Sequence, residues 1–550
     1  MTTPDPTLKQ DAETVGAFTP LRRRLFAMLW IATVVGNIGT FMRDVASAWL
    51  VTEISSSPAA VALVQAAGSL PIFLLAIPAG VLSDILDRRR FLICVQAALA
   101  LVSTALAIIA VTGQVSVASL VALTFLGGAG AAMAMPTWQA ITPELVPRPE
   151  LRSAVALNSL GFNISRALGP ALGGAILAAL GAPATYVLDV ATYVLVIAAL
   201  WSWRRETAAD DGLRERFGGA LRAGLRYARA STGVRRLLGR AALFFAFASA
   251  VWALLPIIVR HQIGGGPGLY GAMLGAVGAG AIMGALLLPA VRHRLSQDRL
   301  VLGASLMTAF ATALLAIAKT PAAGMAVTFL LGVAWIAILT TLNATMQGIL
   351  PNWTRGRGLA VYLTVFNGAM AAGSLLWGVF AQAAGSAIAL ATAGAGLVLA
   401  ALFAHRSELP SGDRDLTPSM HWPEPAMSEP IGNDRGPVLV TVTYRVEPAD
   451  RGAFMAALAR LAEERRRDGA FSWGITEDAG DPEQLVEWFF IESWAEHMRQ
   501  HQRVSRHDAG LQANVQRFHR GEDPPVVRHF IAIETHAEAS MPTSSAEKPA

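Results

Sequence analysis

A series of apolar segments, each about 20 residues long, runs from Leu25 to His405 and constrains the fold of this chain more than any other feature. An α-helix needs about 20 such residues to cross the hydrocarbon core of a bilayer. Only 15% of the residues are charged, whereas soluble domains carry about 25%. We therefore predict an all-α membrane protein with twelve transmembrane helices, near residues 25–51, 58–82, 91–112, 117–140, 153–179, 184–203, 239–260, 269–290, 299–318, 322–346, 359–383 and 386–405.

The first apolar segment follows three consecutive arginines and is long. No cleavage site of small residues comes after it, so we expect it to remain as the first helix rather than to be removed as a signal peptide. Cys94 is the only cysteine and lies inside an apolar segment. The chain can therefore form neither a disulfide framework nor a cysteine metal site.

Arginines gather in alternate gaps between the apolar segments, at 88–90, 148–152, 204–236, 292–299 and 355–357. The remaining gaps carry only Arg260 and Lys319. By the positive-inside rule, both termini and the long 204–237 loop should be cytoplasmic. The net charge of +5 thus reflects membrane orientation, and we expect no nucleic-acid partner.

An internal repeat relates the two halves of the apolar region. Sliding the first half by 204 residues without a gap superposes the following pairs: Pro147 on Pro351, Phe162 on Phe366, Asn163 on Asn367, Gly169 on Gly373, Gly174 on Gly378, Gly80 on Gly284, Arg88 on Arg292 and Arg90 on Arg294. The repeat predicts two parallel six-helix halves, at 21–203 and 238–406, joined by a cytoplasmic linker at 204–237. In such proteins the substrate site lies between the halves near the bilayer midplane.

The composition changes after His405. Residues 407–436 are rich in proline and read as an extended linker. Residues 437–536 then alternate strand and helix patterns in the order βαββαβ, with strands at 438–446, 471–477, 484–492 and 526–534 and helices at 448–467 and 495–519. This order predicts a ferredoxin-like α+β domain. We expect the tails at 1–20 and 537–550 to be disordered.

The segment Gly80-Val-Leu-Ser-Asp84-Ile-Leu-Asp87-Arg88-Arg89-Arg90 closely resembles the signature loop of the major facilitator superfamily. Asp87 stands where the family usually has glycine, and Ile85 stands at its first basic position. The resemblance implies that Asp84 latches the cytoplasmic side in the outward-open state and that Gly80, Arg88 and Arg89 belong to the same conformational gate. The alternative is that these arginines only set the topology.

A second segment, Gly169-Pro170-Ala-Leu-Gly173-Gly174, resembles the helix 5 motif of the exporter branches of the same superfamily. Proline bends the helix and the glycines allow a neighbouring helix to approach closely. The motif favours export. Simple small-residue packing is the alternative.

Ionisable residues inside apolar helices are costly, so each one is a functional candidate. Asn37, Thr40, Asp44 and Ser47 recur every three or four residues on the first helix, and we expect this stripe to face a wet cavity. Arg166 needs an acidic or carbonyl partner, and Asp44 and Asp189 are the acids within its half. Asp189 and Arg43 also fit an ordinary pair near the outer interface.

The second half has a comparable stripe at Thr340, Asn343 and Gln347, and Asn367 should face Asn163 by pseudo-symmetry. This half carries no acid deep in an apolar segment. We therefore expect proton coupling to reside in the N-terminal half, with substrate-cavity and coupling residues Asn37, Thr40, Asp44, Asn163, Arg166, Asp189, Asn343 and Asn367.

Together, residues 37–50, the signature loop and helix 5 resemble the bacterial enterobactin-exporter-like group, over about residues 21–406. The group includes siderophore and drug exporters. The resemblance implies proton-coupled export of amphipathic small molecules across the bacterial inner membrane, with small-molecule substrate, protons and lipid as partners and no cofactor. The alternatives are an importer, or a membrane-anchored enzyme with its chemistry at 437–536.

The C-terminal tract, with Trp473, Trp488 and residues 492–497, resembles antibiotic-biosynthesis monooxygenases in fold. His497 and His501 are one helical turn apart, but the sequence shows no third ligand, so a solvated helix face is favoured over a metal site. Because such sheets commonly pair, we expect a regulatory or dimerising module rather than an enzyme.

Overall fold

The computed structural model describes residues 16–203, 226–351, 353–410 and 435–533, together with residues 415, 417, 419, 422, 427, 429, 431 and 432. The side chains of residues 77, 81, 83–85 and 502 are also outside the description. Most of the predicted tails and the first part of the 204–237 linker therefore lie outside the described residues. The chain divides into two compact units.

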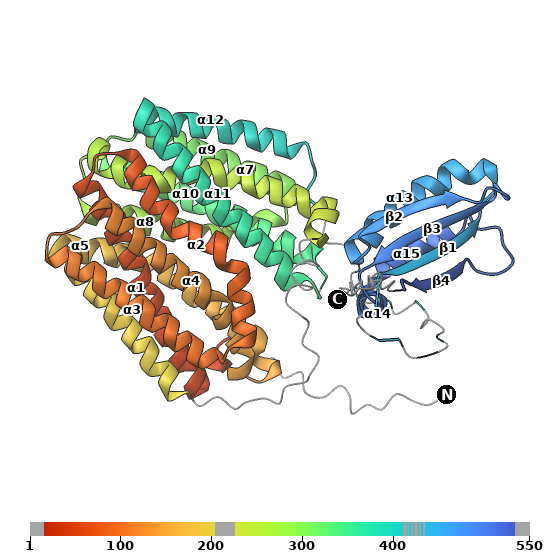
Figure 1. The fold of residues 1–550 in the computed structure, drawn as a ribbon. Helices are drawn as coiled ribbons and strands as arrows, with labels where there is room; N and C mark the ends of the chain where they lie inside the picture. Colours follow the sequence, from red (N-terminus) through yellow and green to blue (C-terminus); the bar gives the residue numbers. More distant parts are fainter. Residues whose placement is uncertain are drawn as a thin grey trace, which may run out of the picture. The chain divides into compact units, whose positions relative to one another are not determined.

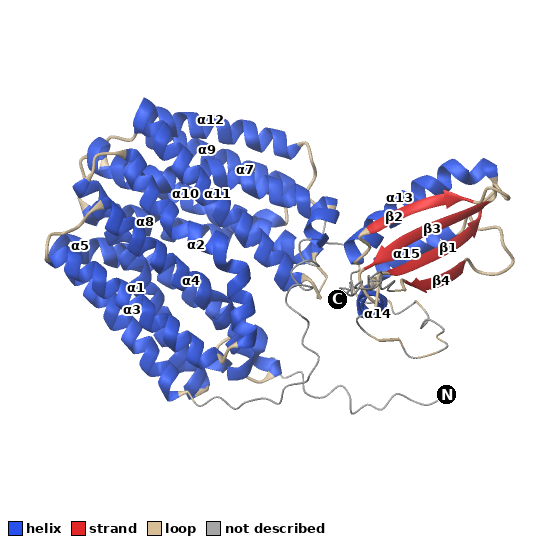
Figure 2. Cartoon of the chain, in the orientation of Figure 1, coloured by secondary structure: helices blue, strands red, loops and turns tan. Residues whose placement is uncertain are grey.

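The first unit is a bundle of long helices (Figures 1 and 2). Eleven helices in the described residues are long and apolar enough to cross a membrane. Their bounds are α1 Arg24–Ile54, α2 Pro58–Ile85, α3 Arg88–Val111, α4 Val117–Leu145, α5 Leu151–Ser202, α7 Thr232–Ile257, α8 Pro267–Arg292, α9 Gln297–Ile317, α10 Pro321–Ile349, α11 Arg355–Ala384 and α12 Ser386–His405. A π-helical turn, Ile258–Ile263, continues α7.

The helix ends follow local capping chemistry. The side chain of Ser57 accepts a hydrogen bond from the Ala60 amide at the start of α2, and Asp87 accepts one from the Arg90 amide at the start of α3. Ser116 forms a capping box with Ser119 at the start of α4. Each of these side chains satisfies a backbone donor that has no partner within the helix.

Helix α5 is 52 residues long and contains one non-helical residue, Gly181, with φ 81°. The predicted break at 180–183 is therefore present as a kink rather than as a gap. Gly385, which separates α11 from α12, has φ 91° and lies 204 residues after Gly181. Glycine tolerates this left-handed conformation because it has no Cβ.

The two halves pack in corresponding ways. Helix α2 packs on α4 as α8 packs on α10, and α3 packs on α5 as α9 packs on α12. The residues paired by the repeat also make matching contacts. The side-chain amide of Asn163 donates to the Ser159 carbonyl at 2.8 Å, and that of Asn367 donates to the Leu363 carbonyl at 2.9 Å. The internal repeat in the sequence thus corresponds to a repeat in packing.

Contacts between the halves gather at the helix ends opposite the arginine-rich connections. The Ser57 hydroxyl donates to Gln382 Oε1 at 2.7 Å, and the rings of Trp49 and Tyr270 stack at 6.0 Å. A buried apolar cluster at these ends draws residues from both halves. By contrast, two buried clusters near the other ends of α1, α3 and α5 contain residues of the N-terminal half only.

The second unit contains a four-stranded antiparallel sheet in the order β2-β3-β1-β4 (Figure 1). The strands are β1 Val438–Arg445, β2 Ser472–Glu477, β3 Gln484–Ile491 and β4 Val526–Ile531. Strands β1 and β3 alternate in burial because one face of the sheet packs on helices. The predicted β2 and β3 hairpin is present, with Asp481 in its turn.

The helices of this unit are α13 Arg451–Asp468, α14 Trp494–Arg503 and α15 Arg506–Gln516. The single helix predicted at 495–519 is divided, because Ser505 starts a new helix with a capping box to Asp508. Phe454 and Leu458 of α13 pack with Tyr444 of β1 in the core. The unit also includes two segments that join membrane helices, 226–232 and Leu350–Arg355.

Candidate functional site

A cluster of buried charged and polar side chains connects α1 to the second arm of α5, after Gly181. Arg43 of α1 is 5% exposed and Asp189 of α5 is fully buried. Their closest atoms, Arg43 Nη1 and Asp189 Oδ2, are 3.9 Å apart. Arg43 also donates to the Tyr193 hydroxyl at 2.9 Å and to Asp44 Oδ1 at 3.0 Å.

Asp189 is held from two directions. Ser103 of α3 donates to Asp189 Oδ2 at 2.6 Å, on the same oxygen that faces Arg43. The other oxygen, Oδ1, is buried without a hydrogen-bond partner among the described residues. An acceptor atom left this way inside a protein is costly.

Two glycines make room for this pair. A Cβ at Gly39 of α1 would come within 2.8 Å of Asp189 Oδ1, and a Cβ at Gly127 of α4 within 3.3 Å of Arg43 Cζ. Larger residues at these positions would displace the charged groups. The cluster is thus built by α1, α3, α4 and α5 together. The sequence analysis named its residues on α1 and α5, but not those on α3 and α4.

The polar stripe of α1 has two environments, one in contact with α5 and one exposed. Thr40 hydrogen bonds to the Tyr193 hydroxyl at 3.1 Å, and Ser47, 3% exposed, to the Tyr186 hydroxyl at 3.1 Å. These two side chains turn toward α5 because its tyrosines supply partners. Asp44 differs, since 53% of its side chain is exposed. Asn37, the first residue of the stripe, is partly buried.

Arg166 does not receive the partner that the sequence suggested. Both candidate acids, Asp44 and Asp189, are engaged by Arg43. Arg166 is partly buried in the first arm of α5 and makes no hydrogen bond or ion pair with any described residue. Asn163, one turn earlier, is exposed. Arg166 therefore presents a charged group that no described residue pairs, whereas the Asn163 amide bonds back to its own helix.

In the second half, Asn343 is partly buried and accepts a hydrogen bond from Gln347 at 2.7 Å. Asn367 is 7% exposed, and its side-chain amide bonds back to its own helix. Asn343 lies in α10 and Asn367 in α11, on the helices where the sequence placed them. No contact between Asn163 and Asn367 occurs among the described interactions.

The predicted gate loop has two arginines with defined contacts. Arg88 donates to the Ala140 carbonyl at 2.9 Å and to Glu144 at 2.8 Å, and so ties α3 to α4. Arg89 donates to the carbonyls of Leu200 and Trp201, at 2.9 and 2.6 Å. Gly80 has open space where a Cβ would lie. The side chain of Asp84 lies outside the described residues.

The glycines of the α5 motif are packing positions. A Cβ at Gly169 would come within 2.6 Å of Phe41 Cβ, and one at Gly173 within 2.7 Å of Met42 Cα, both on α1. At Gly174 it would meet Gly271 Cα of α8 at 2.6 Å. Pro170 lies buried between them. Gly174 therefore belongs to the contact between the two halves. The sequence did not show that this glycine differs from Gly169 and Gly173, which pack within one half.

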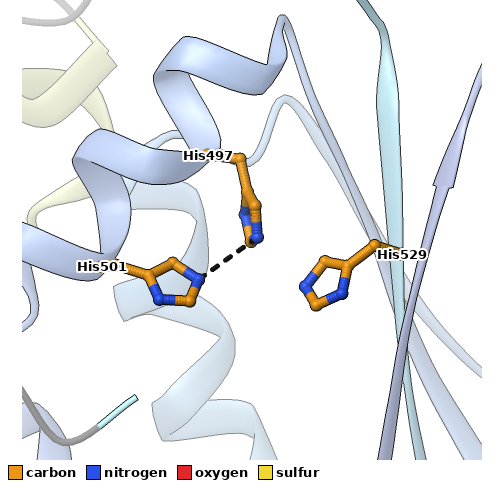
Figure 3. A group of neighbouring side chains, drawn as sticks. All are labelled: His497, His501 and His529. Carbon is orange, nitrogen blue, oxygen red and sulfur yellow. Dashed lines mark hydrogen bonds between the residues drawn. The ribbon is translucent and has the colours of Figure 1, made fainter. Parts of the chain in front are cut away.

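The second unit holds a cluster of three histidines (Figure 3). His497 and His501 of α14 meet His529 of β4, so the third imidazole that the sequence did not reveal is present. His497 is 1% exposed, and the prediction of a solvated helix face is wrong for it. Burial and the neighbouring His529 and His501 lower the pKa of His497 to about 3. Burial also lowers the pKa of His529.

The apolar bundle with two related halves and a buried charge cluster defines a membrane transporter of the major facilitator class. Within that class, the chain belongs to the transmembrane secretion effector family, whose profile matches residues 15–537. It is accordingly a transporter of small molecules and not an enzyme.

Curated relatives cover most of the bundle. The chain is 23% identical over 352 residues to the staphyloferrin A transporter of Staphylococcus aureus, covering 63% of this chain and 87% of that protein. It is 26% identical over 379 residues to the multidrug efflux pump Tap of Mycolicibacterium fortuitum, covering 67% and 91%. A macrolide efflux protein A of Streptococcus pyogenes is 24% identical over 265 residues, covering 48% and 65%.

Solved structures show the same fold. The nucleoside transporter NupG superposes with a TM-score of 0.59 at 12% identity, covering 69% of this chain and 98% of that chain. A bacterial homologue of the lysosomal transporter Spinster, in an inward-facing and unoccupied conformation, gives 0.53 at 13% identity, covering 70% and 97%. The bacterial relatives place the chain in a cell membrane as a multi-pass protein.

Proposed function

We propose that this protein exports amphipathic small molecules, of the siderophore or drug type, in exchange for protons. The relatives named above are a siderophore transporter and efflux pumps for drugs and macrolides. The helix 5 motif supports the same direction. An importer of the same superfamily is the alternative, and the direction of transport in the experiment below separates the two.

The observation that carries proton coupling is the fully buried Asp189 beside Arg43. A carboxylate and a guanidinium in a low-dielectric site stabilise each other, but removing one charge leaves the other uncompensated. Protonation of Asp189 would therefore leave Arg43 paired with Asp44 alone and change the relative energies of the two conformations. Burial makes Asp189 the stronger coupling candidate, and Asp44, with an exposed carboxylate, the second.

Polar side chains of α5, α10 and α11 are proposed to contact substrate. Arg166 and Asn163 lie one turn apart on α5, and Asn343 and Asn367 occupy comparable places in the second half. Asn37 and Thr40 belong to the same proposed cavity, at the border of the charge cluster. Arg166 has no partner among the described residues, and such a cation suits a substrate that carries an anionic or electron-rich group.

Alternating access is supported by the uneven distribution of contacts between the halves. The joint apolar cluster closes the helix ends opposite the arginine-rich connections. If those connections are cytoplasmic, as their arginines favour, the chain is closed on the outer side and both termini are cytoplasmic. The loop with Gly80, Asp84, Arg88 and Arg89 would then exchange its partners when the inner side closes.

Twelve spans are proposed because α5 is too long for one crossing. At 1.5 Å per residue, a helix of 52 residues measures about 78 Å, whereas the hydrocarbon core is about 30 Å thick. Gly181 corresponds in the repeat to Gly385, which separates two helices. The two arms of α5 thus correspond to α11 and α12.

For the C-terminal unit we propose a ferredoxin-like domain over 437–536, because the strand order β2-β3-β1-β4 with antiparallel neighbours agrees with βαββαβ topology. Strand β4 is an edge strand whose Val526, Val527 and Phe530 are each about half exposed. An apolar edge is suited to pairing with a second copy. Replacing Val527 by Glu should then reduce the mass of the detergent-extracted particle from dimer to monomer.

The experiment that tests the function uses purified protein in liposomes with an imposed pH gradient and a panel of siderophores, macrolides and cationic drugs. Wild type should move at least one compound uphill against the proton flux. Asp189→Asn should lose uphill transport by about tenfold or more while retaining downhill exchange. Asp44→Asn is the matched comparison. Uphill transport by Asp189→Asn at the wild-type rate would rule out Asp189, and uphill movement with the proton flux would indicate an importer.

A further inference from the structure

We infer that His497, His501 and His529 form a binding site for a divalent transition metal, with Zn²⁺ as the best match. The ligand nitrogens of the three side chains lie within 4.8 Å of one another. Two come from successive turns of α14 and the third from β4, and Figure 3 shows all three rings directed toward a common point. Such convergence from two elements is what a metal site requires and a solvated surface does not.

The distances agree with tetrahedral coordination. The Nε2 atoms of His497 and His501 are 3.2 Å apart. Zn²⁺ binds imidazole nitrogen at about 2.0–2.1 Å, so two ligands of a tetrahedral ion lie about 3.3 Å from each other. The ring centroids of His497 and His529 are 4.6 Å apart. The His529 nitrogen lies within 4.8 Å of the other two, so the third ring must move inward to complete the geometry.

The surroundings of the cluster also suit a metal. Trp494 packs against His497 and His529, with ring centroids 5.4 and 6.2 Å apart. Arg465, a cation close to His497, is paired with the buried Glu487 at 3.3 Å. Apolar walls and a neutralised charge leave the three imidazoles as the donor set. His497 is buried while the other two are partly exposed, so a fourth position stays open to water or a small anion.

The donor set indicates the class of ion. Imidazole nitrogens suit Zn²⁺, Cu²⁺ and Ni²⁺, whereas Mg²⁺ and Ca²⁺ prefer oxygen ligands. Three histidines with an open fourth position match the pattern of accessible zinc sites. Because α14 and β4 would both be ligated, the ion would crosslink the helix to the edge of the sheet.

The test uses the full-length protein in detergent, without an affinity tag and stripped of metal by a chelator. Equilibrium dialysis against Zn²⁺ should give one ion per chain, and the Co²⁺ form should show a tetrahedral visible spectrum. His529→Gln should weaken Zn²⁺ binding at least 100-fold. If that variant unfolds, His501→Gln replaces it, because His501 is partly exposed and its replacement should be tolerated. His501→Gln should weaken binding by the same factor. His293→Gln, at an exposed position of the other unit, is the matched control and should bind as wild type does.

Three results would overturn the proposal. These are the absence of stoichiometric Zn²⁺ binding by wild type, unchanged binding by His501→Gln, and equal binding of Mg²⁺ and Zn²⁺. The cluster would then be a hydrogen-bonded histidine pair with a third ring packed beside it.

Discussion

Gly174 of α5 and Gly378 of α11, which lie 204 residues apart, make the same contact on the two sides of the bundle. Each approaches the carbonyl oxygen of the first residue of a helix in the other half. A Cβ at Gly174 would meet the Pro267 oxygen of α8 at 2.8 Å, and one at Gly378 would meet the Pro58 oxygen of α2 at 3.2 Å. Glycine is required at both positions because the two backbones touch.

Replacing Gly378 with leucine should therefore open the seam between α11 and α2. Spin labels on Ser57→Cys and Gln382→Cys, in a Cys94→Ser background, report the distance across this seam, which these two residues bridge. We expect a single short distance in the parent and a longer, broader one in Gly378→Leu. Gly303→Leu, where a Cβ has open space, is the control. An unchanged distance in Gly378→Leu would contradict the contact.

Arg43→Gln should destabilise the bundle by about 3–5 kcal/mol, because Asp189 would remain buried without a cation. The double variant Arg43→Gln with Asp189→Asn should recover most of this loss. Thermal stability by size-exclusion in detergent provides the measurement. Arg166→Gln is the comparison, and its effect should stay below about 1 kcal/mol because Arg166 has no partner among the described residues. Equal losses in the two single variants would contradict the assignment of Asp189 to Arg43.

The C-terminal unit should lose stability as the pH rises. Burial, with repulsion from Asp508, raises the pKa of Glu464 to about 8, and burial raises that of Asp468 to about 6. A folded-state pKa above the unfolded value gives stability that is complete below the unfolded pKa and declines as the pH rises through the folded one. The decline should therefore extend from about pH 4, near the unfolded pKa values, to about pH 8.

Thermal unfolding of the full chain at pH 6 and at pH 9 measures this effect. Wild type should lose more than about 1.4 kcal/mol between the two conditions, the equivalent of one pKa unit, and Glu464→Gln should lose clearly less. Glu483→Gln, at an exposed position of the sheet, is the control. A wild type and Glu464→Gln with the same pH dependence would show that Glu464 is ionised throughout.

Removal of the C-terminal unit should leave transport intact, provided that the truncated chain keeps the short segment after His405 that contacts α7 and α9. Arg240 of α7 donates to the Ser407 carbonyl at 2.8 Å, and Asp298 accepts from the Leu409 amide at 3.1 Å. A chain ending at 410 keeps these bonds and one ending at 406 loses them. The longer form should insert and transport, and should unfold at a temperature several degrees above that of the shorter one. Equal stability, or complete inactivity of a folded 1–410 chain, would contradict this.

The truncated chain also tests what the second unit contributes to the behaviour of the transporter. Tyr227 and Trp353, from segments that join membrane helices, contact each other with ring centroids 5.9 Å apart. Arg467 lies over Tyr227 at 5.4 Å and Arg503 over Trp353 at 4.2 Å. Removing the domain removes both arginines, so regulation or oligomeric state is expected to change more than the basal rate.

The amino-acid sequence alone determined the membrane class, the helix positions and the two-fold repeat. These depend on the length of apolar runs and on glycines and prolines that act on their own backbone, as at Gly385, where a helix ends. The strand pattern of the C-terminal unit was readable for the same reason, because side-chain alternation is local.

Only the tertiary structure decided which charges meet. Arg43 rather than Arg166 engages Asp189, because the direction in which a helix turns a side chain depends on the packing of α3, α4 and α5 around it. His529 joins His497 and His501 because β4 lies antiparallel beside β1 at the sheet edge, a pairing between distant segments. Partner choice across a fold depends on long-range packing, which the periodicity of one segment does not encode.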